Sequence, residues 1–331
     1  MPKVTEKKRR RHTALRDDLA CHPAVRAWAA ATSLDSTPEY LHVLRERTNC
    51  AIYRLPGLGA EGTAVIAKRS LARWVRIEST VYESILPRLP LMTPRYYGST
   101  IDEPFGWIFV EDAGDEEYSI SQPEHLALAA QWVGTLHTRA AGIAAAQSLP
   151  DAGPARYLAH LRTGRREILR ITRLWAFPPS ERKALLRAAG VCEAVEARWS
   201  RVEAACHGAP STLVHGDFRP KNAFLRQTDA GLTLCPIDWE TAGFGLPAAD
   251  LARIDLDTYW CVVRRAWPDV TLDSVQRLAK IGQLLGWVAA MEWGTASAQL
   301  SNASVRSAAI GRLDLLVDRL AESGRAAGVL D

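Results

Sequence analysis

The residues best suited to chemistry lie in one polar loop and shortly after it. The loop contains His215, Asp217 and Asn222 at the spacing H-x-D-x-x-x-x-N, and Asp238 follows sixteen residues beyond Asn222. A positioned carboxylate can accept a proton from a hydroxyl group, and carboxylate and amide oxygens are ligands that Mg²⁺ prefers. The chain has 8 His, 18 Asp and 3 Asn. At that composition the spacing would occur by chance roughly 0.004 times, so the pattern indicates a built site rather than a polar surface turn.

The chain around this loop divides into two parts with different patterns. Before residue 112, short segments rich in β-branched and aromatic residues predict a small sheet that carries one helix. After residue 114, apolar residues recur at the spacing of amphipathic helices. The predicted elements are helices at 13–32, 71–88, 124–139, 275–288 and 310–320, and strands at 51–55, 63–68, 95–97, 107–111, 212–214 and 232–237.

The loop and its surroundings resemble a known family. With glycine after His215 and tryptophan after Asp238, the segment is similar to the catalytic loop and metal-binding aspartate of the aminoglycoside phosphotransferase and choline kinase family of small-molecule kinases. The resemblance implies an α+β fold of two lobes, as in protein kinases. Residues 1–34 would then be a basic tail and N-terminal helix, residues 35–112 a small nucleotide-binding lobe, and residues 113–331 a helical lobe that contains the catalytic loop (213–240) and the substrate-binding helices.

The resemblance also implies roles for individual residues, with ATP and Mg²⁺ as cofactors. Asp217 would accept the proton of the acceptor hydroxyl, and Asn222 and Asp238 would hold the metal. His215 is expected to brace the loop rather than to act as a base. Arg219 departs from the histidine that small-molecule kinases usually carry there, and it would stabilise charge on the transferring phosphate.

The small lobe contains candidate nucleotide-binding residues. Lys68 ends an apolar strand, as the phosphate-binding lysine of kinases does. Such a lysine needs an acidic partner on the following helix, for which Glu78 is favoured over Glu83. Asn49 lies in the turn that resembles the phosphate-covering element, which here has no glycine-rich motif. Glu111 lies at the expected hinge, where backbone groups would pair with adenine.

Composition limits the classes of protein. The 331 residues are 47% apolar and 24% charged, as in ordinary soluble domains. Residues 1–11 hold six basic residues and one acidic residue, so the rest of the chain is near neutral despite the net charge of +4. A short basic tail of this kind does not indicate nucleic-acid binding.

No apolar run reaches the ~18 residues of a membrane span. The six cysteines show no metal-binding spacing, and we expect free thiols and a cytoplasmic protein.

The helices after Asp238 are expected to choose the acceptor. They contain three tryptophans and three acidic residues, and aromatic walls suit a ring-bearing compound. The body of the chain lacks the acidic bias expected for binding a polycationic aminoglycoside. We therefore expect a neutral or weakly charged hydroxyl compound, such as an antibiotic or another natural product that contains a sugar or nucleoside. The six residues are Trp260, Trp287, Trp293, Asp255, Asp257 and Glu292.

Two alternatives stay open. The first is a kinase for a metabolite such as choline, homoserine or a free sugar. The second is a catalytically inactive kinase fold that binds a nucleotide or a partner. The presence of all four residues expected to be needed for catalysis argues against it. A protein kinase is not supported, because the glycine-rich loop and the activation segment are both missing. The four key residues are Lys68, Asp217, Asn222 and Asp238.

Overall fold

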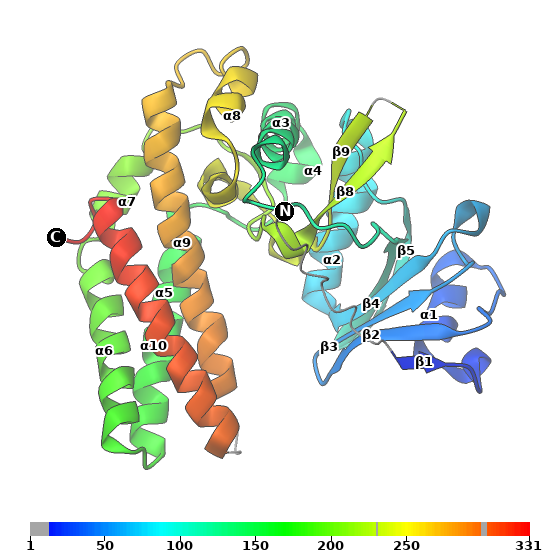
Figure 1. Cartoon of the computed structure of the whole chain (residues 1–331), viewed down its shortest axis with the longest axis horizontal. Coiled ribbons are helices and arrows are strands. Elements are labelled where there is room, and N and C mark those ends of the chain that lie inside the picture. The colour runs from blue at the N-terminus through cyan, green and yellow to red at the C-terminus, as the bar shows by residue number, and fades with distance from the viewer. Residues whose placement is uncertain (1–12, 230, 299–302) are drawn as a thin grey trace, which may run out of the picture.

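The computed structural model describes residues 13–229, 231–298 and 303–331, which form two lobes (Figure 1). The small lobe is an antiparallel sheet of six strands in the order β1-β2-β3-β4-β6-β5. Its strands are β1 (Thr13–Leu15), β2 (Leu41–Arg47), β3 (Cys50–Leu55), β4 (Val65–Leu71), β5 (Tyr96–Asp102) and β6 (Phe105–Glu111).

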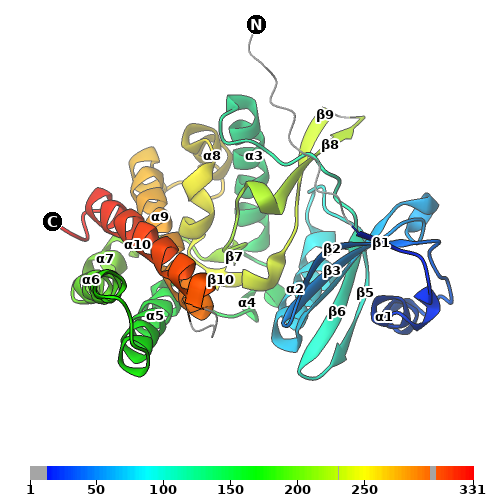
Figure 2. The same ribbon diagram turned by 60° about the horizontal axis from the view of Figure 1, so that its bottom comes forward.

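One helix packs on each face of this sheet. Helix α1 (Pro23–Thr32) covers the outer face, and α2 (Ala72–Thr80) lies between the sheet and the helical lobe (Figure 2). Ala67 of β4 belongs to the apolar cluster under α1. Because side chains alternate along a strand, the next residue, Lys68, points to the opposite face, toward α2. The strand pattern therefore aims this lysine into the space between the lobes.

The helical lobe is formed by the remaining helices and two small strand pairs. Strands β7 and β10 pair with each other, and β8 and β9 form an antiparallel hairpin. Helices α5, α6, α9 and α10 pack side by side at the far end of the lobe (Figure 1). The elements are α3 (Pro123–Ala140), α4 (Ala144–Gln147), α5 (Pro154–Leu174), α6 (Pro179–Glu196), α7 (Trp199–Cys206), β7 (Thr212–Val214), β8 (Ala223–Thr228), β9 (Gly231–Pro236), β10 (Gly243–Gly245), α8 (Leu256–Val263), α9 (Leu272–Ala298) and α10 (Ala303–Ala326).

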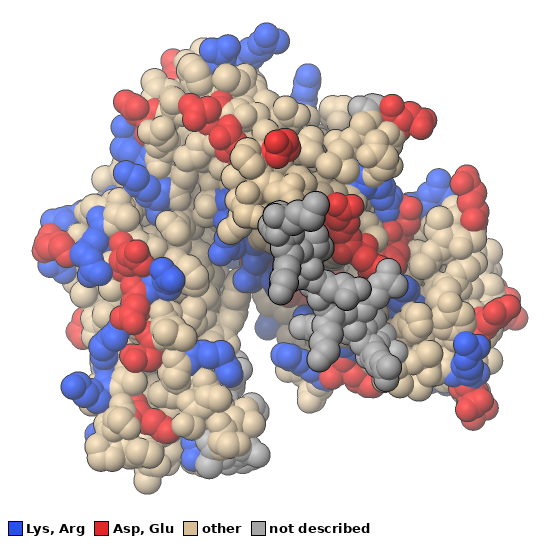
Figure 3. Space-filling model, in the orientation of Figure 1, with Lys and Arg blue, Asp and Glu red and all other residues tan. Residues whose placement is uncertain are grey.

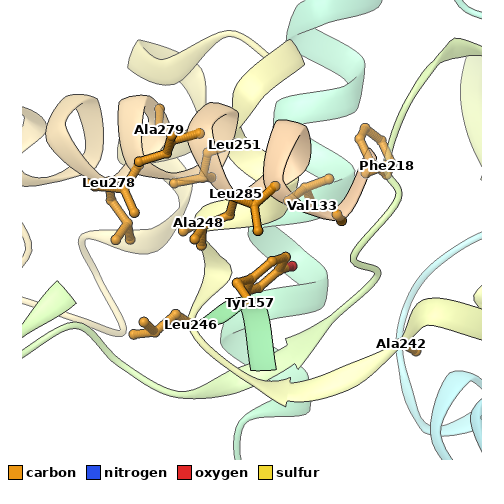
Figure 4. Packing of buried hydrophobic residues seen from close by; sticks show 14 of the residues in the cluster. Val133, Tyr157, Phe218, Ala242, Leu246, Ala248, Leu251, Leu278, Ala279 and Leu285 are labelled. Atoms are coloured by element: carbon orange, nitrogen blue, oxygen red, sulfur yellow. The ribbon is translucent and has the colours of Figure 1, made fainter. Parts of the chain in front are cut away.

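The core of the helical lobe reaches the polar loop. Val133 of α3, Tyr157 of α5 and Leu285 of α9 belong to one buried cluster that also contains Phe218 (Figure 4). Phe218 lies in the loop itself and is only 4% exposed. Burying a phenylalanine side chain stabilises the fold by about 1.5–3 kcal/mol, so this contact holds the loop against the helices.

Two features differ from the sequence-based predictions. The helix expected at 13–32 begins only at Pro23, because a proline suits the first helical turn and the His22 ring accepts a hydrogen bond from the Ala24 N–H at 3.2 Å. Thr13–Leu15 instead pairs with β2 as an edge strand. Strands β2, β8 and β10 were not predicted, and the segment predicted as one helix at 71–88 is an α-helix only over Ala72–Thr80, followed by a π-turn and a 3₁₀ turn. No helix in the described part of the chain is long and apolar enough to cross a membrane.

Candidate active site

A buried aspartate anchors the backbone of the polar loop. Asp250 accepts hydrogen bonds from the backbone N–H groups of His215 (2.7 Å) and Gly216 (2.9 Å). His137 contacts the same carboxylate at 3.3 Å, and both side chains are fully buried. Hydrogen bonds to an ionised acceptor are stronger than those between neutral groups. Asp250 therefore fixes the direction in which the loop leaves β7.

The turn after β7 requires a glycine. Gly216 has a φ of +80°, and a Cβ at this position would lie 2.6 Å from the carbonyl oxygen of Thr241. The preceding ring, that of His215, is fully buried; its Nε2 lies 2.9 Å from the carbonyl oxygen of Ile237 and its centroid 4.5 Å from that of Trp239. The ring thus connects the loop to the segment that carries Asp238.

Asp217 is surrounded by donors from its own loop. Arg219 Nη2 donates to its Oδ2 at 2.7 Å, and Asn222 Nδ2 donates to the same oxygen at 2.9 Å and to its backbone oxygen at 3.0 Å. Lys221 Nζ lies 3.4 Å from Oδ2. These contacts orient the Asp217 carboxylate, and 16% of its side chain is exposed. The structure brings Asp217, Arg219 and Asn222 together, as the spacing suggested.

Lys68 contacts three carboxylates, one from its own lobe and two from the helical lobe. Its Nζ lies 3.1 Å from Glu78 and 3.0 Å from Glu240, and it contacts Asp238 as well. Glu78 is 2% exposed, whereas Glu83 is exposed to solvent. Glu78 is therefore the partner on the helix after the Lys68 strand.

The charges in this cluster do not balance. One ammonium faces three carboxylates, which leaves an excess of negative charge in a mostly buried place. Burial, with Asp238 and Glu240 nearby, raises the pKa of Glu78 to about 7, although Lys68 opposes the rise. Burial also disfavours the ionised form of Asp238, but the ammonium outweighs it and lowers the pKa of that carboxyl. An additional cation would be attracted to this cluster.

The raised pKa of Glu78 predicts a pH-dependent stability. Its folded-state value of about 7 lies above the ordinary 4.5, so folding takes up a proton at this group. The resulting stabilisation is complete at acid pH and is lost as the pH rises through the folded pKa. Between about pH 5 and pH 8 the melting temperature of the nucleotide-free protein should fall relative to that of Glu78→Gln, whose amide cannot ionise. Melting curves at constant ionic strength measure this.

A matched variant separates this effect from a general change of charge. Glu83→Gln makes the same substitution on the next turn at an exposed position, and its melting temperature should stay parallel to that of the wild type across the same pH range. If the Glu78→Gln curve is parallel as well, Glu78 does not titrate in the folded protein at an elevated pKa.

The remaining nucleotide-site candidates have different surroundings. The side chain of Glu111 is engaged by Arg226 (3.2 Å) and by the backbone N–H of Arg95 (3.1 Å), so it is turned into the protein. Nearby, no described group accepts a hydrogen bond from the N–H of Ala113, a buried residue in the segment between the lobes. Asn49 is exposed in the β2–β3 turn, directly before Cys50.

The residues expected to contact an acceptor fall into two groups. Trp287 and Trp293 line an open pocket beside the polar loop, whose space totals about 640 Å³ when the open solvent at its mouth is included. The others do not line it. Trp260 donates to the carbonyl oxygen of Val270, Asp255 caps α8, Asp257 is exposed in the first turn of α8, and Glu292 pairs with His160.

Three residues of the site were not singled out from the sequence. Glu240 lies two residues after Asp238, and a second carboxylate so close to the first was a usable signal. Asp250 contacts the loop across a separation of 35 residues, which no local pattern in the sequence indicates. Arg253, which also lines the pocket beside the loop, follows a short 3₁₀ segment with no distinctive pattern.

Comparisons with known proteins agree with this geometry. The family model described as "Phosphotransferase enzyme family", APH, matches residues 67–290. Among solved structures, the chain is similar to macrolide 2′-phosphotransferase MphH from Brachybacterium faecium, with 17% identity, a TM-score of 0.53 and coverage of 82% of this chain and 91% of that one. No curated protein sequence matches the chain.

Two further structures share the fold. The GDP complex of a variant of aminoglycoside 2′-phosphotransferase IIIa has 14% identity and a TM-score of 0.59, over 88% of this chain and 95% of that one. Plasmodium vivax ethanolamine kinase has 13% identity and a TM-score of 0.52, over 83% and 81% of the two chains. The family model covers more than half of the chain, and the solved structures share its two-lobed α+β fold. The chain therefore belongs to the APH phosphotransferase enzyme family and is a small-molecule kinase.

Proposed function

We propose that this protein uses MgATP to phosphorylate a hydroxyl group of a small molecule, either an antibiotic or another natural product that contains a sugar or nucleoside. The observation that carries the proposal is the meeting of Lys68 with Asp238 and Glu240 from the other lobe, beside a loop that presents Asp217 to a pocket. This arrangement supplies a place for phosphates, a place for a metal and a proton acceptor next to a space for the acceptor.

The residues around Lys68 fit a magnesium ion. Asp238 and Glu240 offer carboxylate oxygens, and the Asn222 amide nitrogen points at Asp217, which turns the amide oxygen away from that residue. No three His, Cys, Asp or Glu side chains among the described residues form a complete metal site. Magnesium suits such an incomplete set, because it is usually held by one or two carboxylates together with substrate phosphates and water. When bound, it would neutralise charge on the β- and γ-phosphates.

The small lobe fits the rest of the nucleotide. Lys68, held by Glu78, would contact the α- and β-phosphates. The free N–H of Ala113 and the carbonyl oxygen of Glu111 are suited to pair with adenine, so Glu111 would act through its backbone and not its side chain. Asn49 would cover the phosphates from the β2–β3 turn. In family members, GDP occupies one solved structure and ADP another.

Asp217 performs the proton transfer in this proposal. The acceptor oxygen attacks the γ-phosphorus, the bond between this phosphorus and the bridging oxygen of the leaving ADP breaks, and the hydroxyl proton passes to Asp217 Oδ. Arg219 holds that carboxylate, and its Nε has no partner among the described residues. The Arg219 guanidinium would stabilise the negative charge that develops on the transferring phosphoryl group.

A mass-shift screen tests the proposed function. Purified protein is incubated with MgATP and a panel that contains aminoglycosides, macrolides, nucleoside antibiotics, aryl glycosides, choline, homoserine and free sugars. A gain of ~80 Da on one compound, the mass of a transferred phosphoryl group, supports the proposal and identifies the acceptor class. A gain on choline, homoserine or a free sugar alone would replace it with a metabolite kinase. Absence of MgATP binding would contradict it.

A further inference from the structure

The pocket beside Asp217 has a composition that selects among acceptors. One wall is a face of α9, on which Gly282, Gly286 and Trp293 follow at helical spacing, with Trp287 beside them. Gly282 is buried against the backbone of Ala248, whereas Gly286 is exposed and a Cβ there would meet nothing within 4 Å, so open space lies above Gly286. Trp293 is 41% exposed although it faces this pocket. An exposed tryptophan on a concave wall is suited to stacking on a flat or ring-shaped ligand.

The charges around the pocket are mainly positive. Asp217 is the one carboxylate among the lining residues, and it is already paired with Arg219. Arg253 is the second guanidinium of the lining. Its side chain is half-buried, and no described residue pairs with it. Figure 3 shows basic side chains on the side of the helical lobe that faces the hollow between the lobes.

An unpaired, half-buried guanidinium implies a partner supplied by the ligand. Partial burial removes part of the hydration free energy of the Arg253 guanidinium. A charge-assisted hydrogen bond to an anionic oxygen in the pocket would offset this loss. A cationic group in the same place would be repelled by Arg253 and by Arg219. Such repulsion is an effective way to reject wrong ligands.

We infer that the acceptor is a ring-bearing hydroxyl compound that carries a carboxylate or another anionic group and no amine. This inference rests on the proposed function for the identity of the pocket as the acceptor site. In the bound state the ring lies against Trp287 and Trp293, the anionic group pairs with Arg253, and the hydroxyl faces Asp217. Polycationic aminoglycosides are excluded by the charge of the lining.

Ion-selective quenching of Trp293 fluorescence tests the charge of the pocket without any acceptor. The signal of Trp293 is isolated as the difference between the wild type and Trp293→Phe. At matched low ionic strength, the ratio of iodide to caesium quenching for this signal should exceed the same ratio for free N-acetyltryptophanamide at least about twofold, because a positive field concentrates anions. Arg253→Glu should abolish or reverse the preference, while Arg265→Glu, an exposed arginine outside the lining, should preserve it. A wild-type ratio no greater than that of N-acetyltryptophanamide overturns the inference.

A charge-matched acceptor series provides the second arm. Phenyl β-glucuronide, phenyl β-glucoside and the phenyl glycoside of glucosamine share a ring and a size but carry charges of −1, 0 and +1 near neutral pH. Binding to the ATP-free protein by calorimetry should follow that order, and Arg253→Gln should remove the advantage of the glucuronide. Tightest binding by the amine overturns the inference.

The two proposals fail in different ways. If the quenching preference and the binding order are as expected but no compound in the screen gains phosphate, the pocket selects anions and the kinase activity is what lacks support. If an aminoglycoside is phosphorylated efficiently, the proposed function stands and the anionic acceptor is wrong.

Discussion

Asp217→Asn should lower turnover by a factor of about 10² or more, because general-base catalysis typically contributes 10² to 10⁴. The amide cannot accept the hydroxyl proton, yet it has nearly the same shape as the carboxylate. Among the described residues, Lys68 pairs with Glu78, Asp238 and Glu240 and not with Asp217, so affinity for MgATP should be nearly unchanged. Steady-state kinetics and equilibrium nucleotide binding measure the two effects separately.

The control for this variant is Asp257→Asn. It makes the same chemical change at an exposed position in the first turn of α8, outside the pocket that Asp217 lines. The control should keep full turnover. If Asp217→Asn retains more than half of the wild-type rate, the assignment of Asp217 as the proton acceptor is wrong.

Asp238→Ala should remove the magnesium-dependent part of nucleotide binding and nearly all turnover. A bound metal contributes several kcal/mol to such a site, so the affinity for MgATP should fall about 10²-fold. The loss is expected because the other two ligands that we propose, Glu240 and Asn222, would not hold the metal equally well. Nucleotide affinities measured with Mg²⁺ and with a chelator give the metal-dependent increment directly.

A second substitution separates metal binding from folding. Asp238 has a φ of +70°, a backbone conformation that asparagine and aspartate tolerate better than alanine. Asp238→Asn should therefore keep the melting temperature closer to the wild type while still losing the metal-dependent increment. Unchanged affinity for MgATP in both variants would contradict the metal role of Asp238.

The polar loop was predictable because its chemistry is local in sequence. The spacing from His215 to Asn222 sets which side chains meet within the turn. Lys68 and the choice of Glu78 over Glu83 came from the resemblance of their strand and helix to those of kinases. The strand predicted to end at Lys68 continues to Leu71, but the short range between the lysine and its helix keeps both assignments local in sequence.

Other parts of the site depend on contacts between distant segments. Asp250 reaches the loop only after the chain has passed through β8, β9 and β10. No pattern in its own segment indicates that it accepts hydrogen bonds from two backbone N–H groups of the loop. The acceptor pocket joins Arg253 to a face of α9 in the same way. Three tryptophans looked equivalent in the sequence, but only packing shows that Trp260 faces away from the pocket that the other two line.

The contact of Lys68 with three carboxylates has a consequence for the order of binding. The Lys68 ammonium contacts the carboxylates of Asp238 and Glu240 that we assign to the metal, so free magnesium would have to compete with this ammonium for them. ATP changes this competition, because its phosphates give the ammonium new partners and release those oxygens. By linkage, each of the two ligands then raises the affinity for the other, and metal and nucleotide enter most favourably as one complex.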